Sequence, residues 1–140
     1  MARAATNDPL RVELRNQTKQ TRLHVLRLKR AAKLLGTRPS GKVGHGVLGL
    51  IRDGDYAIAT SAPSGVRDAH LIGAAQRIAH FELAALGTAR TFAGKLGEIE
   101  VEGLLAETLH EKGEANRQLT AIAAHVNDEA INADESGENN

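Results

Sequence analysis

Apolar residues recur along three long stretches of the chain at alternating steps of four and three, the period of an amphipathic α-helix. The first stretch begins at Asp8, which suits a helix cap, and at Pro9, which suits the first helical position. Its apolar seam consists of Leu14, Thr18, Thr21, Val25, Leu28, Ala32 and Leu35. Gly36 and Pro39 are expected to end this first helix.

The segment that follows predicts a loop, a short helix and a second break. "GTRPSGKVGHG" has the composition of a loop, and "SAPSG" interrupts the chain again. We expect a short helix between them, whose inner face carries Val43, Val47, Ile51 and Ile58. Four glycines in or beside it lower its helix propensity: Gly44, Gly46, Gly49 and Gly54.

Two more long helices are predicted, joined by a tight connection. The third helix runs from about Val66 to Lys95, with a seam of Ile72, Gln76, Ala79, Leu83, Leu86 and Ala93. "GKLGE" is short, so the fourth helix should return antiparallel to the third. Its seam consists of Val101, Leu105, Thr108, Ala115, Leu119, Ile122 and Val126.

This order of elements predicts an all-α bundle with three long helices and one short crossover helix. A long crossover between parallel helices is typical of ferritin-like folds, although length and period alone allow any helical bundle. We expect one helical domain over residues 1–127. Residues 128–140 hold five acidic residues and no basic one, which predicts a disordered acidic tail.

Composition narrows the chemistry. The chain has 140 residues, enough for one domain with a core, and aromatic residues make up only 2%, which favours close-packed helices. It contains no cysteine, so disulfides, zinc–thiolate sites and thiol catalysis are excluded. No stretch has the roughly 20 apolar residues of a membrane span, and the start has no signal-peptide pattern. We therefore expect a cytoplasmic protein.

Several polar residues lie on or beside the apolar seams, where an unpaired charge is costly to bury. They are Glu82, Glu107, Glu111, His24, His80 and His110. Glu107 and His110 have the Glu-x-x-His spacing that di-metal helical bundles use. The pattern is short enough to arise by chance, so the residues alone favour a solvated or packed helix face over a metal site.

Basic residues are concentrated at the start of the chain. Residues 1–42 hold 11 of the 18 basic residues, and their only acids are Asp8 and Glu13. The first helix presents a basic stripe of Arg11, Arg15, Arg22, Lys29 and Lys33. Such a stripe can bind the phosphates of nucleic acid, but no helix-turn-helix or aromatic stacking pattern accompanies it. A solvated face is the favoured interpretation.

Two segments make the sequence similar to a known family. "RDAHLIGAAQRIAHFELAALGTAR" and "LLAETLHEKGEANRQL" closely resemble the corresponding helices of the YciE/YciF family of ferritin-like stress proteins. The resemblance covers almost the whole chain up to about residue 130. It implies a ferritin-like four-helix bundle, usually dimeric, with a di-iron or similar di-metal site and a link to stress responses.

The departures from the family pattern imply a degenerate site. Ala79 stands where the family has a carboxylate, and Lys19 and Gln20 stand where acids are usual. After these departures, the candidate metal ligands that the resemblance implies are Glu82, Glu107, His110 and Glu111, with His24 or His80 assisting. We expect iron or manganese binding to be weak or absent and catalysis to be slight. The alternative is a structural, oligomerising helical protein without metal.

The resemblance also bears on assembly. Family members usually begin with another helix, and "MARAATNDP" matches only its end. We expect an apolar groove between the first and fourth helices of this chain, lined by Val25, Leu28, Leu105 and Ile122. Because large exposed apolar patches are rare in monomers, a homodimer or a helix from a partner protein is expected to cover it.

Overall fold

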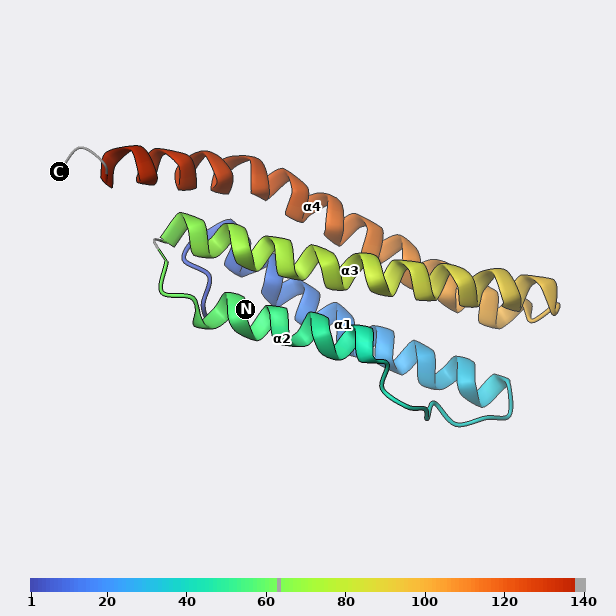
Figure 1. Ribbon diagram of the computed structural model, residues 1–140. Helices are drawn as coiled ribbons and strands as arrows, with labels where there is room; N and C mark the ends of the chain where they lie inside the picture. The colour runs from blue at the N-terminus through green and yellow to red at the C-terminus, as the bar shows by residue number, and fades with distance from the viewer. Residues whose placement is uncertain (63, 138–140) are drawn as a thin grey trace.

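Four helices form the computed structural model, which describes residues 1–62 and 64–137, with side chains up to residue 132. They are α1 (Asp8–Leu34), α2 (His45–Ala59), α3 (Ser64–Lys95) and α4 (Ile99–Gly137). Figure 1 shows them lying side by side as an elongated bundle, with the loops at its two ends. The predicted all-α bundle of three long helices and one short crossover helix is confirmed.

Local hydrogen bonds fix both ends of α1. The cap is Asn7, one residue earlier than predicted: its Oδ1 accepts a hydrogen bond from the Leu10 amide at 3.1 Å. At the other end Gly36 has φ +66°, and the Thr37 amide donates to the Ala32 carbonyl at 2.9 Å. This is the Schellman arrangement that glycine favours.

A glycine also makes the tight turn between α3 and α4. Gly97 has φ +74°, and the Glu98 amide donates to the Ala93 carbonyl at 3.0 Å. The chain therefore reverses within a few residues, and α4 packs antiparallel along α3 as predicted (Figure 1).

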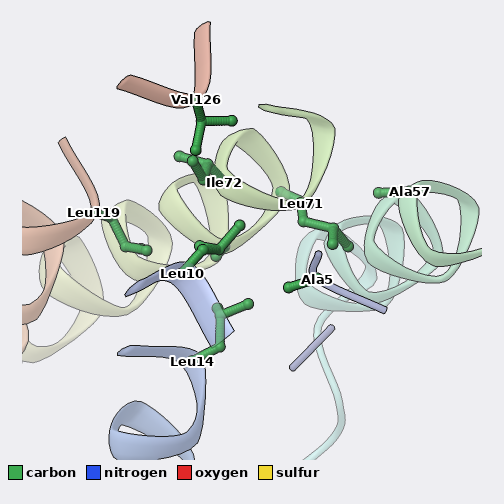
Figure 2. Close-up of a cluster of buried hydrophobic side chains, with 10 residues drawn as sticks. Ala5, Leu10, Leu14, Ala57, Leu71, Ile72, Leu119 and Val126 are labelled. Carbon is green, nitrogen blue, oxygen red and sulfur yellow. The ribbon is translucent and has the colours of Figure 1, made fainter. Parts of the chain in front are cut away.

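Two clusters of buried side chains make the core. The larger one joins the N-terminal segment to all four helices (Figure 2) and contains Ala5, Leu10, Leu14, Ala57, Leu71, Ile72, Ala74, Ala75, Leu119 and Val126. The smaller one lies toward the α3–α4 turn and contains Ala31, Ala93, Val101 and Leu105. Small and aliphatic residues fill both clusters, as the low aromatic content predicts.

The seam predicted for α4 is confirmed. Ile122 is half-buried, and the other six predicted residues are buried. Close packing joins α4 to both α1 and α3, and joins α2 to α3, whereas α1 and α2 make no comparable contact within the described residues. The central position of α4 explains why its pattern is so regular.

The seams predicted for α1 and α2 are wrong in part. On α1 the predicted positions Thr18, Thr21, Val25, Leu28 and Leu35 are exposed. The face that packs inward instead carries Leu10, Glu13, His24 and Ala31 together with the predicted Leu14 and Ala32. Val43 lies in the loop before α2, the predicted Ile51 and Ile58 are exposed, and the buried residues of α2 are Gly54 and Ala57.

Helix α4 also extends further than predicted. It continues through residues 128–137, where the sequence predicts a disordered acidic tail, and residues 138–140 lie outside the described part. Over the described residues, no helix combines the length and apolar character that crossing a bilayer requires.

Candidate functional site

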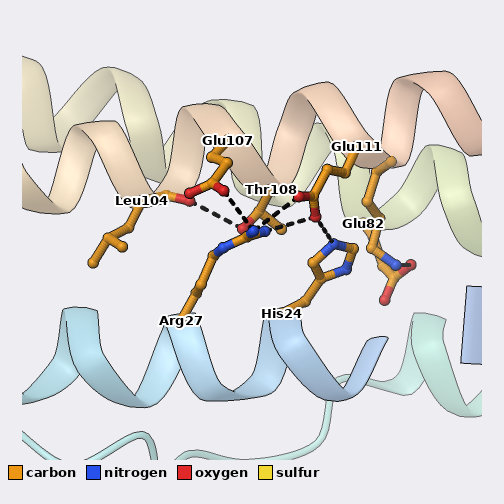
Figure 3. A network of polar contacts seen from close by, with 8 residues as sticks. His24, Arg27, Glu82, Leu104, Glu107, Thr108 and Glu111 are labelled. Carbon is orange, nitrogen blue, oxygen red and sulfur yellow. Dashed lines mark hydrogen bonds and ion pairs between the residues drawn. The ribbon is translucent and has the colours of Figure 1, made fainter. Parts of the chain in front are cut away.

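The polar residues between α1 and α4 converge on one arginine. Arg27 of α1 donates to both carboxylate oxygens of Glu111, at 2.6 and 2.8 Å, and to Glu107 Oε1 at 2.6 Å (Figure 3). Only 18% of the Arg27 side chain is exposed. Bidentate arginine–carboxylate pairs are among the strongest ionic hydrogen bonds. The guanidinium therefore links α1 to two turns of α4.

His24 adds a second contact to the same carboxylate. It lies one helical turn before Arg27, and its Nε2 is 2.8 Å from Glu111 Oε2. Because an ionised carboxylate only accepts, the proton lies on Nε2 and the ring donates. The other ring nitrogen, Nδ1, is buried and has no hydrogen-bond partner among the described residues.

These contacts determine the charge state of Glu111. The hydrogen bond from Arg27 is the main cause that lowers the pKa of Glu111 from 4.5 to about 2, with a smaller contribution from His24. Burial acts in the opposite direction. The hydrogen bond with Glu111 also raises the pKa of Arg27 above its ordinary value. The pair is therefore fully ionised at neutral pH.

A second ion pair joins α3 to α4. Lys112 Nζ lies 2.5 Å from Glu82 Oε2, and the lysine side chain is 13% exposed. Next to this pair, a cleft of about 370 Å³ is lined by residues that include His24, Glu82, Lys112 and Gln20. Every carboxylate of the predicted site thus has a basic side chain of the protein as its partner.

The two remaining predicted ligands lie outside this network. His110 of α4 is exposed. His80 is also exposed, and its Nε2 is 3.4 Å from Asn116 Nδ2. The structure therefore brings together His24, Glu107 and Glu111, places Glu82 nearby with Lys112, and separates His80 and His110 from them. Within the described residues, no three His, Asp or Glu side chains are arranged so that they could hold a metal ion.

The sequence analysis missed the two basic residues that organise the network. Arg27 is three residues after His24, so both lie on one face of α1. Lys112 lies on the step pattern of α4 between Thr108 and Ala115, where an apolar residue is expected. A basic residue at a seam position beside a candidate carboxylate is the signal that could have identified Lys112, whereas for Arg27 the signal is its position one turn after His24.

A third buried polar residue, Asp68 near the start of α3, was also missed. It is 1% exposed and accepts hydrogen bonds from the Thr6 amide at 2.9 Å, the Thr6 hydroxyl at 2.7 Å and the Asn7 amide at 2.6 Å. These contacts tie the segment that precedes α1 to α3. The role of Asp68 is therefore to position the N-terminal segment.

Comparisons with known proteins agree with this architecture. The chain is 41% identical over 85 residues to Protein YciF of Escherichia coli K12, a match that covers 60% of this chain and 51% of that protein. The matched region thus spans about half the length of that relative.

Two solved structures have the same arrangement of helices. The crystal structure of the Escherichia coli stress protein YciF aligns with a TM-score of 0.86 and 30% identity over 91% of this chain and 80% of that one. YcfI from Rhodopseudomonas palustris aligns with a TM-score of 0.80 and 32% identity over 85% and 76%. The family model described as "Domain of unknown function (DUF892)" matches residues 1–132. This chain belongs to the DUF892 family, the family of YciF.

Proposed function

We propose that this chain is a structural, non-catalytic member of the YciF family, in which ion pairs take the place of a di-metal centre. One observation carries the proposal: Arg27 binds both Glu111 and Glu107, the two α4 carboxylates that would face a metal. Lys112 does the same for Glu82. The network then serves to hold α1, α3 and α4 in register.

The donor set fits two divalent cations poorly. A di-metal bundle site uses a glutamate from each of two helices and Glu-x-x-His from each of the other two. Here α1 contributes His24 and Arg27 but no carboxylate to the network, and Ala79 of α3 offers no ligand atom. A metal ion would also have to displace or approach two positive side chains, Arg27 and Lys112, at close range.

The biological setting is proposed from the relative. The Escherichia coli homologue of known structure is described as a stress protein, and we propose that this chain also acts in a stress response. A structural protein of this kind acts through assembly rather than turnover. We therefore propose that it works as a homodimer or with a helix from a partner.

Removing the two internal cations tests the proposal. Titration with Mn²⁺ under isothermal calorimetry should show little binding to the wild-type protein. The double variant R27M/K112M should bind Mn²⁺ at least ten-fold more tightly, because it removes the arginine and the lysine that neutralise the three carboxylates. R30M is the matched control, since Arg30 pairs with the exposed Glu100 away from the network. Stoichiometric binding by the wild type would contradict the proposal.

A further inference from the structure

The apolar stripe of α1 is only partly covered by the described residues. Val25, Leu28 and Leu35 are 44%, 40% and 47% exposed, although their spacing is that of a packed helix seam. Helix α1 instead turns His24 and Arg27 toward α4. The ion-pair network thus fixes the rotation of α1 and leaves its apolar stripe facing outward.

This stripe borders a groove between α1 and α2. A hollow of about 230 Å³ is lined by Val25 and Leu28 of α1, Val47 of α2, and Phe81 and Leu86 of α3. The groove predicted between α1 and α4 forms only in part, because these helices pack together along part of their length. Of its four predicted lining residues, Val25 and Leu28 line this hollow, Leu28 and Leu105 line a second hollow further along α1, and Ile122 packs beside the larger core cluster.

The groove continues toward the loop that follows α1. A second hollow of about 660 Å³ begins at Leu28 and passes Leu35 and Val43 to Phe92 and Leu96. These side chains are all at least 40% exposed. From Thr21 to Leu35 the groove follows 14 helical steps, or about 21 Å at 1.5 Å per residue. That length accommodates roughly four turns of another helix.

Both ends of the groove are basic. At the α2 C-terminal end, a hollow beside Ile58 is bounded by four cationic side chains: Arg3, Arg15, Lys19 and Arg22. At the other end, Arg38 and Lys42 line the second hollow, and Glu98 is the one acidic residue among the described residues of its wall. None of these six cations has an ion-pair partner in the described part of the chain.

We propose that this groove binds an amphipathic helix of another protein, with an apolar stripe of about four turns and acidic residues at both ends. The apolar stripe would cover Val25 and Leu28, and the acidic ends would pair with the basic residues of the groove. A second copy fits less well. In a two-fold pairing the same surface meets itself, so the basic ends of both copies would be brought together and would repel each other.

This inference rests on the assembly role proposed above and names the surface and the chemistry of the partner; it does not depend on whether a metal binds. The test uses three synthetic fluorescent peptides of 18 residues, measured by anisotropy with the full-length protein. One has a leucine seam and glutamates at both ends, the second replaces the glutamates with lysines, and the third has the first composition with the seam scrambled. The first peptide should bind at least ten-fold more tightly than the other two, with an affinity that falls as salt increases.

Two substitutions locate the binding surface. L28E places a charge in the groove, whereas L23E places it on an exposed position of α1 that lines none of these hollows. We expect L28E to weaken peptide binding at least ten-fold and L23E to leave it unchanged, while circular dichroism shows that both stay folded. Equal binding of all three peptides, or no binding, would overturn the inference. So would a dimer in sedimentation that L28E alone dissociates, since it would place a second copy in the groove.

Discussion

Arg27 of α1 donates two hydrogen bonds to the Glu111 carboxylate of α4, at 2.6 and 2.8 Å. Both side chains are less than one-third exposed. From the sequence this carboxylate is a candidate metal ligand, and here the guanidinium takes both of its oxygens. This one relationship sets the rotation of α1 and supports the structural function proposed above.

Removing the guanidinium should destabilise the bundle. Among the described residues, R27M leaves Glu111 with His24 as its only partner and Glu107 with none. We therefore expect the free energy of unfolding to fall by about 1–3 kcal/mol. Urea denaturation measures the change. R30M removes an ion pair whose two side chains are more than half exposed, and should change stability by less than about 0.5 kcal/mol. Equal effects of the two variants would show that the network adds nothing beyond a surface ion pair.

The network should also produce a specific dependence on pH. The pKa of Glu111 is lowered from 4.5 to about 2 in the folded protein. The ionised carboxylate therefore stabilises the fold above pH 4.5, and this stabilisation is lost as the pH falls from 4.5 to 2. The difference in unfolding free energy between the wild type and E111Q should shrink over that interval. Denaturation curves at four pH values measure it, and a constant difference would contradict the assignment.

Asp68 should be essential to the attachment of the N-terminal segment. D68A leaves the Thr6 and Asn7 amides without their acceptor, and we expect a loss of about 2–4 kcal/mol. Hydrogen exchange should become faster at these two amides. D53A is the control, because Asp53 is exposed and lies 3.7 Å from Arg77. Unchanged exchange in D68A would show that other contacts hold the segment.

Two glycines in the long helices should respond in opposite directions to alanine. At Gly65 of α3, an added Cβ would lie 2.9 Å from the backbone of Ala130 in α4, so G65A should destabilise by about 1–3 kcal/mol. At Gly103 of α4, an added Cβ has nothing within 4 Å, so G103A should stabilise by roughly 0.5–1 kcal/mol through helix propensity. Thermal unfolding compares them. A stabilising G65A would mean that α3 and α4 can separate there without loss.

The sequence predicts α4 well and α1 poorly, for a physical reason. Helix α4 packs against both α1 and α3, so burial determines its apolar positions from Val101 to Val126, with Lys112 as the charged exception. Helix α1 carries an apolar stripe and a polar face, and periodicity places the apolar stripe inward. The polar side chains of Arg27 and His24 instead bind carboxylates on α4. The spacing of apolar residues along α1 contains no information about ion-pair partners such as Glu111, which lies more than 80 residues away in the sequence.

The inner face of α2 was mispredicted for another reason. The pattern of large apolar residues selects Ile51 and Ile58, whereas Gly54 and Ala57 are buried. Small residues allow two helices to approach closely. A prediction based on the spacing of large apolar side chains therefore does not identify a face made of glycine and alanine. The site residues were found only in part, because the sequence pattern identifies the carboxylates but not the basic residues that neutralise them.

The most direct test of the ion-pair network is the metal content of the protein as purified. The full chain would be expressed in medium supplemented with iron and manganese, and its metals counted by inductively coupled plasma mass spectrometry after gel filtration. With Arg27 and Lys112 neutralising the carboxylates, we predict well under one iron or manganese atom per chain. One or two tightly held atoms per chain would contradict the proposal that ion pairs replace the di-metal centre.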